Sequence, residues 1–195
     1  MNIQQISILL ILVSVSQCCF GQTSDSLKAI RFERMQTNEF LKEEIYDFQG
    51  KELPEFELSL INGKKLNSRS LKGKPTLINF WFASCAPCIK KMPSLNKIKT
   101  EFSEEVNFIA ITFHNKQEVA SFLGKREFNF THLVDSKEYL KKFGFFGYPK
   151  TLILDKNLII TQIEKRIPKD LQNEEKNISA FEERVRTTLR ELSKT

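Results

Sequence analysis

Apolar residues form short continuous runs in the middle of the chain, and this pattern predicts buried β-strands. Residues 76–83 read TLINFWFA and residues 106–113 read VNFIAITF, each with few polar positions. Runs of this length without alternation are typical of strands that are covered on both faces. Shorter apolar stretches predict further strands at 130–135, 151–155 and 158–167, the last two joined by a tight antiparallel turn.

Helical spacing separates these strands. In residues 86–102 apolar positions recur every three or four residues, as expected of a helix with one buried face. Pro93 lies inside this helix and should kink it, because proline lacks the N–H of the helical ladder. Further helices are predicted at 116–127, 136–144 and 177–194. Strands that alternate with helices and end in a hairpin and a helix predict a mixed α/β sheet with helices on both faces.

The region before the first buried strand contains a turn signal. Residues 56–68 read FELSLINGKKLNS, two short alternating segments around Asn62–Gly63, which predicts a β-hairpin with a two-residue turn. Residues 22–51 are charged and lack runs of β-branched residues. They predict a helix or a charged lead-in, and the sequence assigns them no role.

The first 21 residues predict a signal peptide. The apolar run from Ile6 to Val15 is too short for a membrane span of ~20 residues and has the length of a signal-peptide core. Cys19 and Gly21 supply small residues at the −3 and −1 positions of a cut before Gln22, although no Lys or Arg precedes the run. Lipoprotein processing at Cys18 or Cys19 is the alternative, and the chain would touch a membrane only in that case.

Length and composition fit one main domain behind this leader. The 195 residues are 41% hydrophobic, enough for one ordinary core, and we expect that domain to span residues 52–195. The formal charge of +6 comes from lysines that alternate with glutamates along the chain. Because no basic stripe or recognition motif is present, a nucleic-acid partner is not predicted.

Export would leave Cys85 and Cys88 as the only cysteines of the mature chain. Two cysteines this close together close too short a loop to constrain much of the unfolded chain, so a structural staple is disfavoured. A structural zinc site needs four ligands, and only His114 and His132 remain as candidates. We therefore expect no metal, although a copper site on these cysteines and histidines stays open.

The position of the pair favours redox chemistry. Cys85 should lie at the N-terminus of the 86–102 helix, with Pro87 in its first turn, where unpaired N–H groups stabilise a thiolate. Such thiols have a pKa below the ~8.5 of free cysteine. Cys85 is then the exposed attacking thiol, and Cys88, one turn further along, resolves the mixed disulfide.

Two residues near the pair should tune its redox balance. Asn79, six positions before Cys85, cannot titrate and so provides no buried carboxylate. Lys91 lies three positions after Cys88, where an ammonium would favour thiolates and raise the reduction potential. The alternative is that Lys91 and its neighbour Lys90 both point into solvent.

These motifs resemble the thioredoxin superfamily, and within it the exported TlpA/ResA-like thiol-disulfide oxidoreductases. The resemblance rests on NFWFASCAPCIKKMP at 79–93 and FFGYPKTLILD at 145–155, and it covers about residues 52–194. It implies a thioredoxin-like mixed sheet flanked by helices, with the hairpin as an N-terminal extension. It also implies that Trp81 lies beside the disulfide.

The resemblance further implies a cis peptide between Tyr148 and Pro149, beside the cysteine pair, where the Tyr148 backbone binds an extended substrate chain. Three positions depart from the pattern. Ser84 stands where many relatives have Trp, Lys91 replaces an acidic residue of some ResA-like proteins, and Lys150 replaces a common threonine. The substrate is therefore harder to infer than the chemistry.

The expected function is an exported thiol-disulfide oxidoreductase of the periplasm or cell envelope, with no cofactor beyond the Cys85–Cys88 disulfide. The resemblance implies a reductase, as in cytochrome c maturation or envelope redox homeostasis, with protein thiol or disulfide substrates and a membrane-linked thiol donor or acceptor. Two alternatives stay open. A peroxiredoxin-like peroxidase expects threonine where this chain has Phe82, and a copper-binding chaperone would lack enzyme activity.

Overall fold

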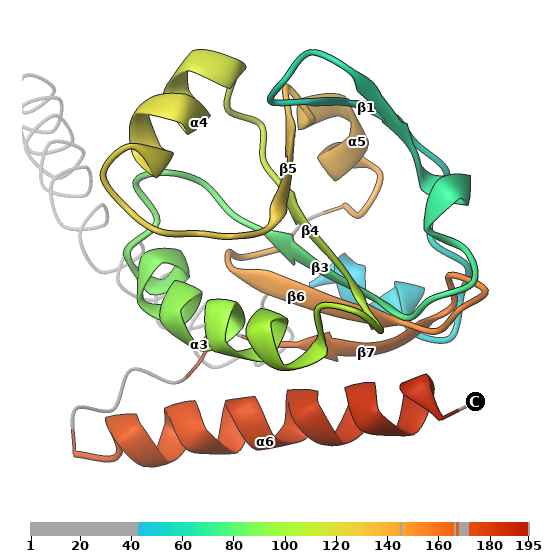
Figure 1. Ribbon diagram of the computed structural model, residues 1–195, viewed down its shortest axis with the longest axis vertical. Coiled ribbons are helices and arrows are strands. Elements are labelled where there is room, and N and C mark those ends of the chain that lie inside the picture. The colour runs from blue at the N-terminus through green and yellow to red at the C-terminus, as the bar shows by residue number, and fades with distance from the viewer. Residues whose placement is uncertain (1–42, 145, 166, 168–171, 195) are drawn as a thin grey trace, which may run out of the picture. The chain divides into compact units, whose positions relative to one another are not determined.

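A mixed β-sheet is the centre of the protein. The computed structural model describes residues 43–144, 146–165, 167 and 172–194. Within them the sheet has seven strands in the order β2-β1-β5-β4-β3-β6-β7, in which β4 runs parallel to β3 and β5 and all other neighbours are antiparallel (Figure 1). The strands are β1 (Glu57–Leu60), β2 (Lys65–Asn67), β3 (Thr76–Phe80), β4 (Asn107–Ile111), β5 (Thr131–Val134), β6 (Lys150–Leu154) and β7 (Ile160–Glu164).

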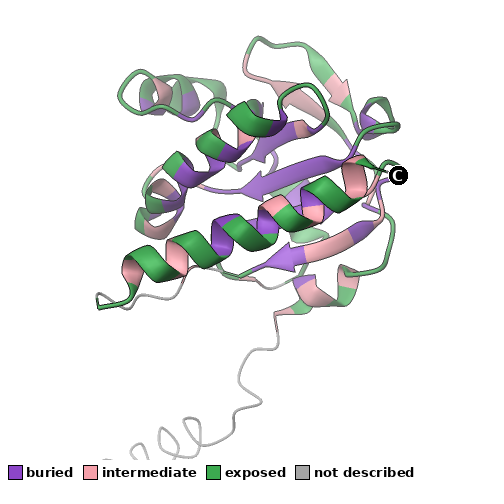
Figure 2. Ribbon diagram, turned by 60° about the horizontal axis from the view of Figure 1, so that its bottom comes forward, coloured by how far each residue is buried: buried purple, intermediate pink, exposed green. Residues whose placement is uncertain are grey.

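Helices cover both faces of the sheet. The α-helices are α3 (Ala86–Phe102), α4 (Lys116–Leu123), α5 (Lys137–Lys141) and α6 (Glu174–Ser193), and the 3₁₀ helices are η1 (Glu44–Phe48) and η2 (Ser68–Leu71). Helices α3 and α6 lie side by side on one face (Figure 1). Figure 2 shows the buried stripe of α6, which carries Phe181, Val185 and Leu189. The predicted mixed α/β sheet with helices on both faces is confirmed.

Alternation along the strands divides the apolar side chains between two cores. Leu77 and Trp81 face the core under α3, α4 and α6, whereas Ile78 and Phe80 face a second core with α5 and η1. Successive residues of a strand point to opposite faces, so a continuous apolar run such as that of β3 fills both cores. The same alternation sends Asn79 to the α3 side and Lys150 to the η1 side.

The predicted N-terminal hairpin is present, but its turn is longer than expected. Strand β1 ends at Leu60 and β2 begins at Lys65, so the connection is not the two-residue turn that Asn62–Gly63 predicted. The Asn62 side-chain oxygen accepts a hydrogen bond from the backbone N–H of Lys64 at 3.0 Å. Gly63 has a φ of 86°, a conformation that favours glycine. The asparagine side chain thus builds a wider turn of its own.

The compact unit that contains the sheet starts at Glu43. It therefore includes residues 43–51, which the sequence pattern assigns to a charged lead-in before the domain. Ile45 of η1 is fully buried in the α5-side core, which fastens this segment to the sheet. Further along, the segment pairs with the outer side of β7, since the Gly50 N–H donates to the Ile160 carbonyl at 2.8 Å and the Ile160 N–H donates to the Lys51 carbonyl at 2.9 Å.

Candidate active site

A disulfide joins Cys85 to Cys88 at the start of α3. Cys85 is the N-cap of that helix, and its Sγ accepts a hydrogen bond from the backbone N–H of Cys88 at 3.2 Å. Pro87 lies in the first turn, where its missing N–H removes no intrahelical bond. The free N–H groups and the dipole at a helix N-terminus favour negative charge, so this position stabilises a Cys85 thiolate once the disulfide is reduced.

Both cysteines are buried in this disulfide form. Cys85 is 4% exposed and Cys88 is 1% exposed, so the expectation that Cys85 is an exposed thiol is wrong for this state. The core that contains the cysteine pair is also packed by the partly buried side chains of Phe82, Ala83 and Tyr148. Tyr148 is distant in sequence, so the burial of the pair could not be predicted from the residues around it. Cys85 keeps the larger exposure of the two, but the difference is small.

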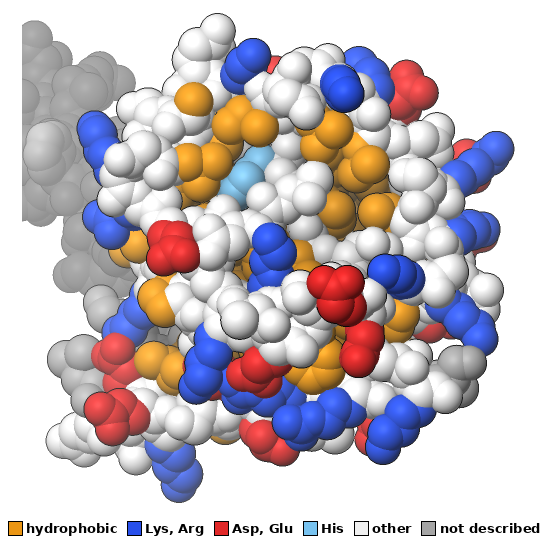
Figure 3. Space-filling model, viewed as in Figure 1, with side chains coloured by type: hydrophobic (Ala, Val, Ile, Leu, Met, Phe, Trp, Pro, Cys, Tyr) orange, Lys and Arg blue, Asp and Glu red, His pale blue; other side chains and the backbone are white. Residues whose placement is uncertain are grey.

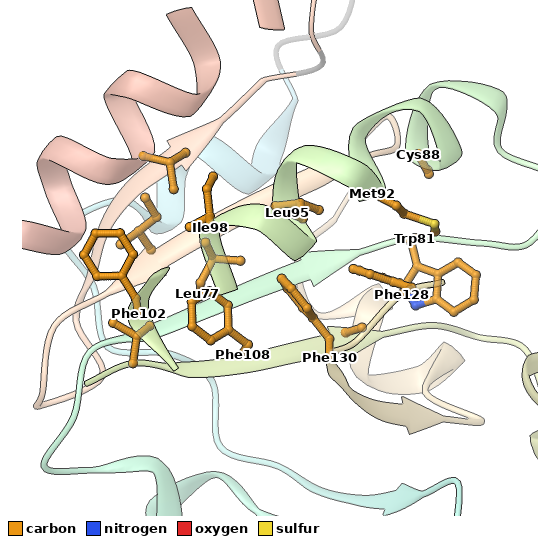
Figure 4. Close-up of a cluster of buried hydrophobic side chains, with 14 of the residues drawn as sticks. Leu77, Trp81, Cys88, Met92, Leu95, Ile98, Phe102, Phe108, Phe128 and Phe130 are labelled. Atoms are coloured by element: carbon orange, nitrogen blue, oxygen red, sulfur yellow. The ribbon is translucent and has the colours of Figure 1, made fainter. Parts of the chain in front are cut away.

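Trp81 is completely buried in the same apolar cluster as the cysteine pair. Its ring centroid lies 4.8 Å from that of Phe122 and 5.7 Å from that of Phe128. Figure 4 shows Trp81 at the same end of the cluster as Met92 and Cys88. Since it is the single tryptophan of the chain, its fluorescence reports on this end of the core.

The Tyr148–Pro149 peptide is cis, as the resemblance implies. Strand β6 pairs antiparallel with β3, with Lys150 opposite Phe80, and this register continued by one residue brings Pro149 to the level of Trp81. The Tyr148 ring lies 5.2 Å from that of Phe82, edge to face. The register therefore brings the proline turn to the cysteine end of the sheet, although the two segments are about sixty positions apart in sequence.

An apolar hollow of about 220 Å³ adjoins Tyr148. Phe113, on its edge, is 40% exposed and is the one large hydrophobic side chain exposed among the residues that the structure describes. The lining consists of aromatic and aliphatic side chains together with two lysines: Phe113, Lys137, Leu140, Lys141, Gly144, Phe146 and Tyr148. The hollow lies next to the Tyr148–Pro149 turn, so a molecule that binds at this turn could also contact it.

Lys91 lies inside the protein. It is 1% exposed, so the alternative that Lys91 points into solvent is wrong, whereas Lys90 is about half exposed and pairs with Glu174 at 2.5 Å. The ammonium of Lys91 donates to Thr151 Oγ1 at 3.1 Å, and the Thr151 hydroxyl donates to Asn79 Oδ1 at 3.0 Å. The two predicted tuning residues are therefore connected through Thr151, which the sequence did not single out.

The surroundings of Lys91 lower its pKa from 10.5 to about 7. Burial is the largest cause, because removal from water disfavours the charged form. The Glu164 carboxylate opposes this, and the charges of Lys150 and Arg184 add to it. The ammonium also lies 4.0 Å from the centroid of the Phe181 ring, which partly compensates for lost water.

Neither histidine joins the cysteines in a metal-binding cluster. His114 Nδ1 contacts Glu118 at 2.9 Å, and His132 Nε2 lies 2.8 Å from the Phe128 carbonyl. Burial lowers the pKa of His132 below its ordinary value. In the described part of the chain, no three His, Cys, Asp or Glu side chains gather closely enough to hold a metal ion.

Neither the distribution of surface charge nor the described helices point to a particular binding partner. Basic and acidic side chains are interspersed on the face shown in Figure 3. None of the helices in the described part of the chain is both long and apolar enough to span a bilayer. The predicted signal peptide at 1–21 and the alternative lipid attachment at Cys18 or Cys19 lie outside the described residues.

Comparison with known proteins extends these observations. Residues 48–180 match the Redoxin family. The chain is 30% identical over 128 residues to the thioredoxin-like protein YneN of Bacillus subtilis, which covers 64% of this chain and 75% of that protein. It is 32% identical over 121 residues to the thiol-disulfide oxidoreductase ResA of Bacillus thuringiensis, which covers 60% of this chain and 69% of ResA.

Solved structures show the same architecture. A Chlorobium tepidum structure described as a thiol:disulfide interchange protein DsbE superposes with a TM-score of 0.62 at 19% identity, over 72% of this chain and 97% of the other. The thioredoxin domain of a Bacteroides vulgatus thiol-disulfide oxidoreductase superposes with a TM-score of 0.56 at 22% identity, over 68% and 96%. At these identities the likeness concerns the fold, and it confirms the thioredoxin-like sheet.

Fold and relatives together define the class of this protein as a thiol-disulfide oxidoreductase with a thioredoxin fold. The residues matched make up more than half of the chain. The chain belongs to the Redoxin family, as a TlpA/ResA-like member of the thioredoxin superfamily.

Proposed function

We propose that this protein is an exported reductase that exchanges protein disulfides through Cys85 and Cys88. The observation that carries the proposal is the Cys85–Cys88 disulfide at the N-cap of α3. The reducing direction rests on the resemblance to ResA-like proteins alone, since the name of the relative, thiol-disulfide oxidoreductase, covers both directions. The physiological role would be cytochrome c maturation or envelope redox homeostasis, in the periplasm or cell envelope.

The exchange proceeds in two steps. The reduced Cys85 thiolate attacks one sulfur of a substrate disulfide, so the substrate S–S bond breaks and one substrate thiolate leaves and takes up a proton. Cys88 then loses its proton and attacks Cys85 Sγ, which releases the second substrate thiol and forms the Cys85–Cys88 disulfide. Two electrons pass to the substrate, and a membrane-linked dithiol must return them before the next cycle.

Substrate binding involves the turn beside the pair. The Tyr148 backbone offers hydrogen bonds to an extended substrate chain, and Pro149 follows it at the start of β6. The apolar hollow next to Tyr148 would receive a neighbouring side chain of the substrate. Trp81 supports the pair from within the core.

Asn79 and Lys91 would adjust the reduction potential through their hydrogen-bonded link at Thr151. A charged Lys91 favours the thiolate form of the cysteines and so raises the potential. Because burial brings the pKa of Lys91 to about 7, its charge would change near neutral pH. We therefore expect the potential to fall with pH more steeply in the wild type than in a Lys91→Met variant.

The test combines a potential with a trapping experiment. The potential of the pair is followed by Trp81 fluorescence against a dithiothreitol or glutathione series, and a value near ~−270 mV supports a reductase whereas one near ~−120 mV supports an oxidase. Cys88→Ser should accumulate a mixed disulfide with a disulfide-containing protein, and the matched Cys85→Ser variant should not. If neither the wild type reduces protein disulfides nor Cys88→Ser traps one, the proposal is wrong.

Three further measurements address alternative activities and location. Turnover of peroxide with a thiol donor would identify a peroxidase instead, and stoichiometric Cu(I) binding without disulfide exchange would identify a copper-binding module. Cell fractionation with and without residues 1–21 tests export. Retention of the full chain in the cytoplasm would contradict it.

A further inference from the structure

A glutamate just before η1 contacts the substrate-side turn at two points. Glu43 Oε1 accepts a hydrogen bond from the backbone N–H of Gly147 at 2.6 Å. Glu43 Oε2 forms an ion pair with the ammonium of Lys150 at 2.5 Å. Gly147 and Lys150 lie on either side of Tyr148–Pro149, so one carboxylate fixes both ends of the turn.

This contact is well buried on the lysine side. The Lys150 side chain is 3% exposed, and its ammonium also lies 5.2 Å from the centroid of the Tyr46 ring of η1. Burial alone would raise the pKa of Glu43, but the bonds from Lys150 and Gly147 outweigh it and hold that pKa below its ordinary value. The carboxylate is therefore charged at neutral pH, when it binds the turn most strongly.

Two glycines leave space for the glutamates of this segment. A Cβ atom at position 147 would lie 3.0 Å from Glu43 Oε1, closer than side chains normally pack. A Cβ atom at position 144 would overlap the Glu44 carboxylate, and Gly144 also has a φ of 65°. The turn sequence is thus shaped to accept residues 43–44, which Ile45 anchors in the core.

We propose that Glu43 is a positioning residue for substrate binding, which holds the Gly147–Lys150 turn so that the Tyr148 backbone can pair with an extended protein substrate. The inference rests on the proposed function, because it assumes that a protein disulfide is bound at this turn. Glu43 does not touch the cysteines in any contact that the structure gives for it, so its effect passes through the turn. It therefore acts on substrate affinity and not on the redox pair itself.

The test measures kcat and KM for reduction of a disulfide-bonded protein by the full chain. Glu43→Ala removes both contacts and should raise KM roughly tenfold or more, because a misplaced binding turn weakens substrate alignment. Glu43→Gln keeps an acceptor for Gly147 and should fall between the wild type and Glu43→Ala. The matched control is Glu52→Ala, which removes an exposed ion pair with Lys72 and should leave KM unchanged.

The reduction potential and thermal stability are measured on the same variants. A rise in KM with an unchanged reduction potential and melting temperature supports a positioning role. A merely structural role would lower the melting temperature and would not change KM selectively. If Glu43→Ala destabilises the fold, Lys150→Met keeps the apolar stem but removes the ammonium, and with it the ion pair to Glu43 and the contact with the Tyr46 ring, and it should raise KM in the same direction. An unchanged KM in both Glu43→Gln and Lys150→Met overturns the inference, whereas a wild type that reduces no protein disulfide overturns the proposed function.

Discussion

Replacement of Lys91 tests how much the burial of a charged group costs this fold. A buried ammonium should lower the free energy of unfolding. Methionine has a similar length and can pack against Phe181 without a charge. In the unfolded chain the lysine keeps its proton up to a pH of about 10.4. In the fold its pKa is about 7, so below that pH the folded protein holds the full penalty of a buried charge. We expect Lys91→Met to be more stable than the wild type at pH 6.

The magnitude follows from the pKa. A drop from 10.5 to about 7 corresponds to roughly 5 kcal/mol, at about 1.4 kcal/mol for each factor of ten in the proton affinity. The variant also removes hydrogen bonds to Thr151 Oγ1 and the Lys165 carbonyl, at a loss of about 1 kcal/mol each. The expected net gain at pH 6 is therefore about 2 to 4 kcal/mol, in the range found when buried ionic groups are replaced by apolar ones.

The pH dependence provides an independent check. Between about pH 7 and pH 10 the unfolded lysine binds more protons than the folded one, so the free energy of unfolding of the wild type rises with pH in that window. Urea unfolding of the oxidised protein at pH 6 to 10 should show the advantage of Lys91→Met shrinking above about pH 7 and vanishing at about pH 9, after which the lost hydrogen bonds make the variant the less stable protein. Lys90→Met is the matched control, and since Lys90 is about half exposed and only forms a surface ion pair with Glu174, it should change stability by less than about 1 kcal/mol at any pH.

One result would refute this reasoning. If Lys91→Met is less stable than the wild type at pH 6 and the two profiles run parallel up to pH 10, the fold stabilises the ammonium instead of penalising it. Glu164 and the Phe181 ring would then outweigh burial.

Three further predictions concern other parts of the core. Burial lowers the pKa of His132, so below about pH 6.5 the unfolded chain binds a proton at this histidine more readily than the folded protein does. As the pH is lowered through this range, the melting temperature of the wild type should therefore fall more than that of His132→Phe. Arg186 bonds to Glu101 at 2.7 Å and Glu182 at 3.0 Å, and urea unfolding of Arg186→Ala should show a loss of about 1–3 kcal/mol; an unchanged midpoint would contradict this. Trp81→Phe should abolish the change in tryptophan emission on reduction, because Trp81 is the single tryptophan of the chain, and a persisting change would show that another group reports on the disulfide.

Much of the fold was predictable because its signals are local. The apolar runs predicted β3 and β4, and the helical spacing placed α3 at residues 86–102, the bounds that the structure shows. Pro87 and Cys85 mark the start of that helix in the sequence itself. The hairpin turn was predicted too short, because the Asn62 side chain makes a hydrogen bond that the Asn–Gly signal does not specify.

The parts of the site that were missed depend on long-range contacts. The link between Lys91 and Asn79 needs Thr151, which lies opposite Asn79 only because β6 pairs with β3 in one register. The contacts of Glu43 depend on how η1 docks against a turn about one hundred positions away in sequence. The burial of Lys91 likewise depends on α6, whose Phe181 covers it.

The segment that follows η1 also affects how molecules of this protein behave toward one another. An uncovered outer strand offers free N–H and C=O groups to which a second chain can add a strand, the first step of aggregation. Here Ile160, the first residue of β7, already bonds on its outer side to Gly50 and Lys51. The opposite edge strand, β2, is three residues long and begins with an exposed lysine. One end of β7 and the short, lysine-bearing β2 are thus less open to the addition of a further strand than a long uncovered edge would be.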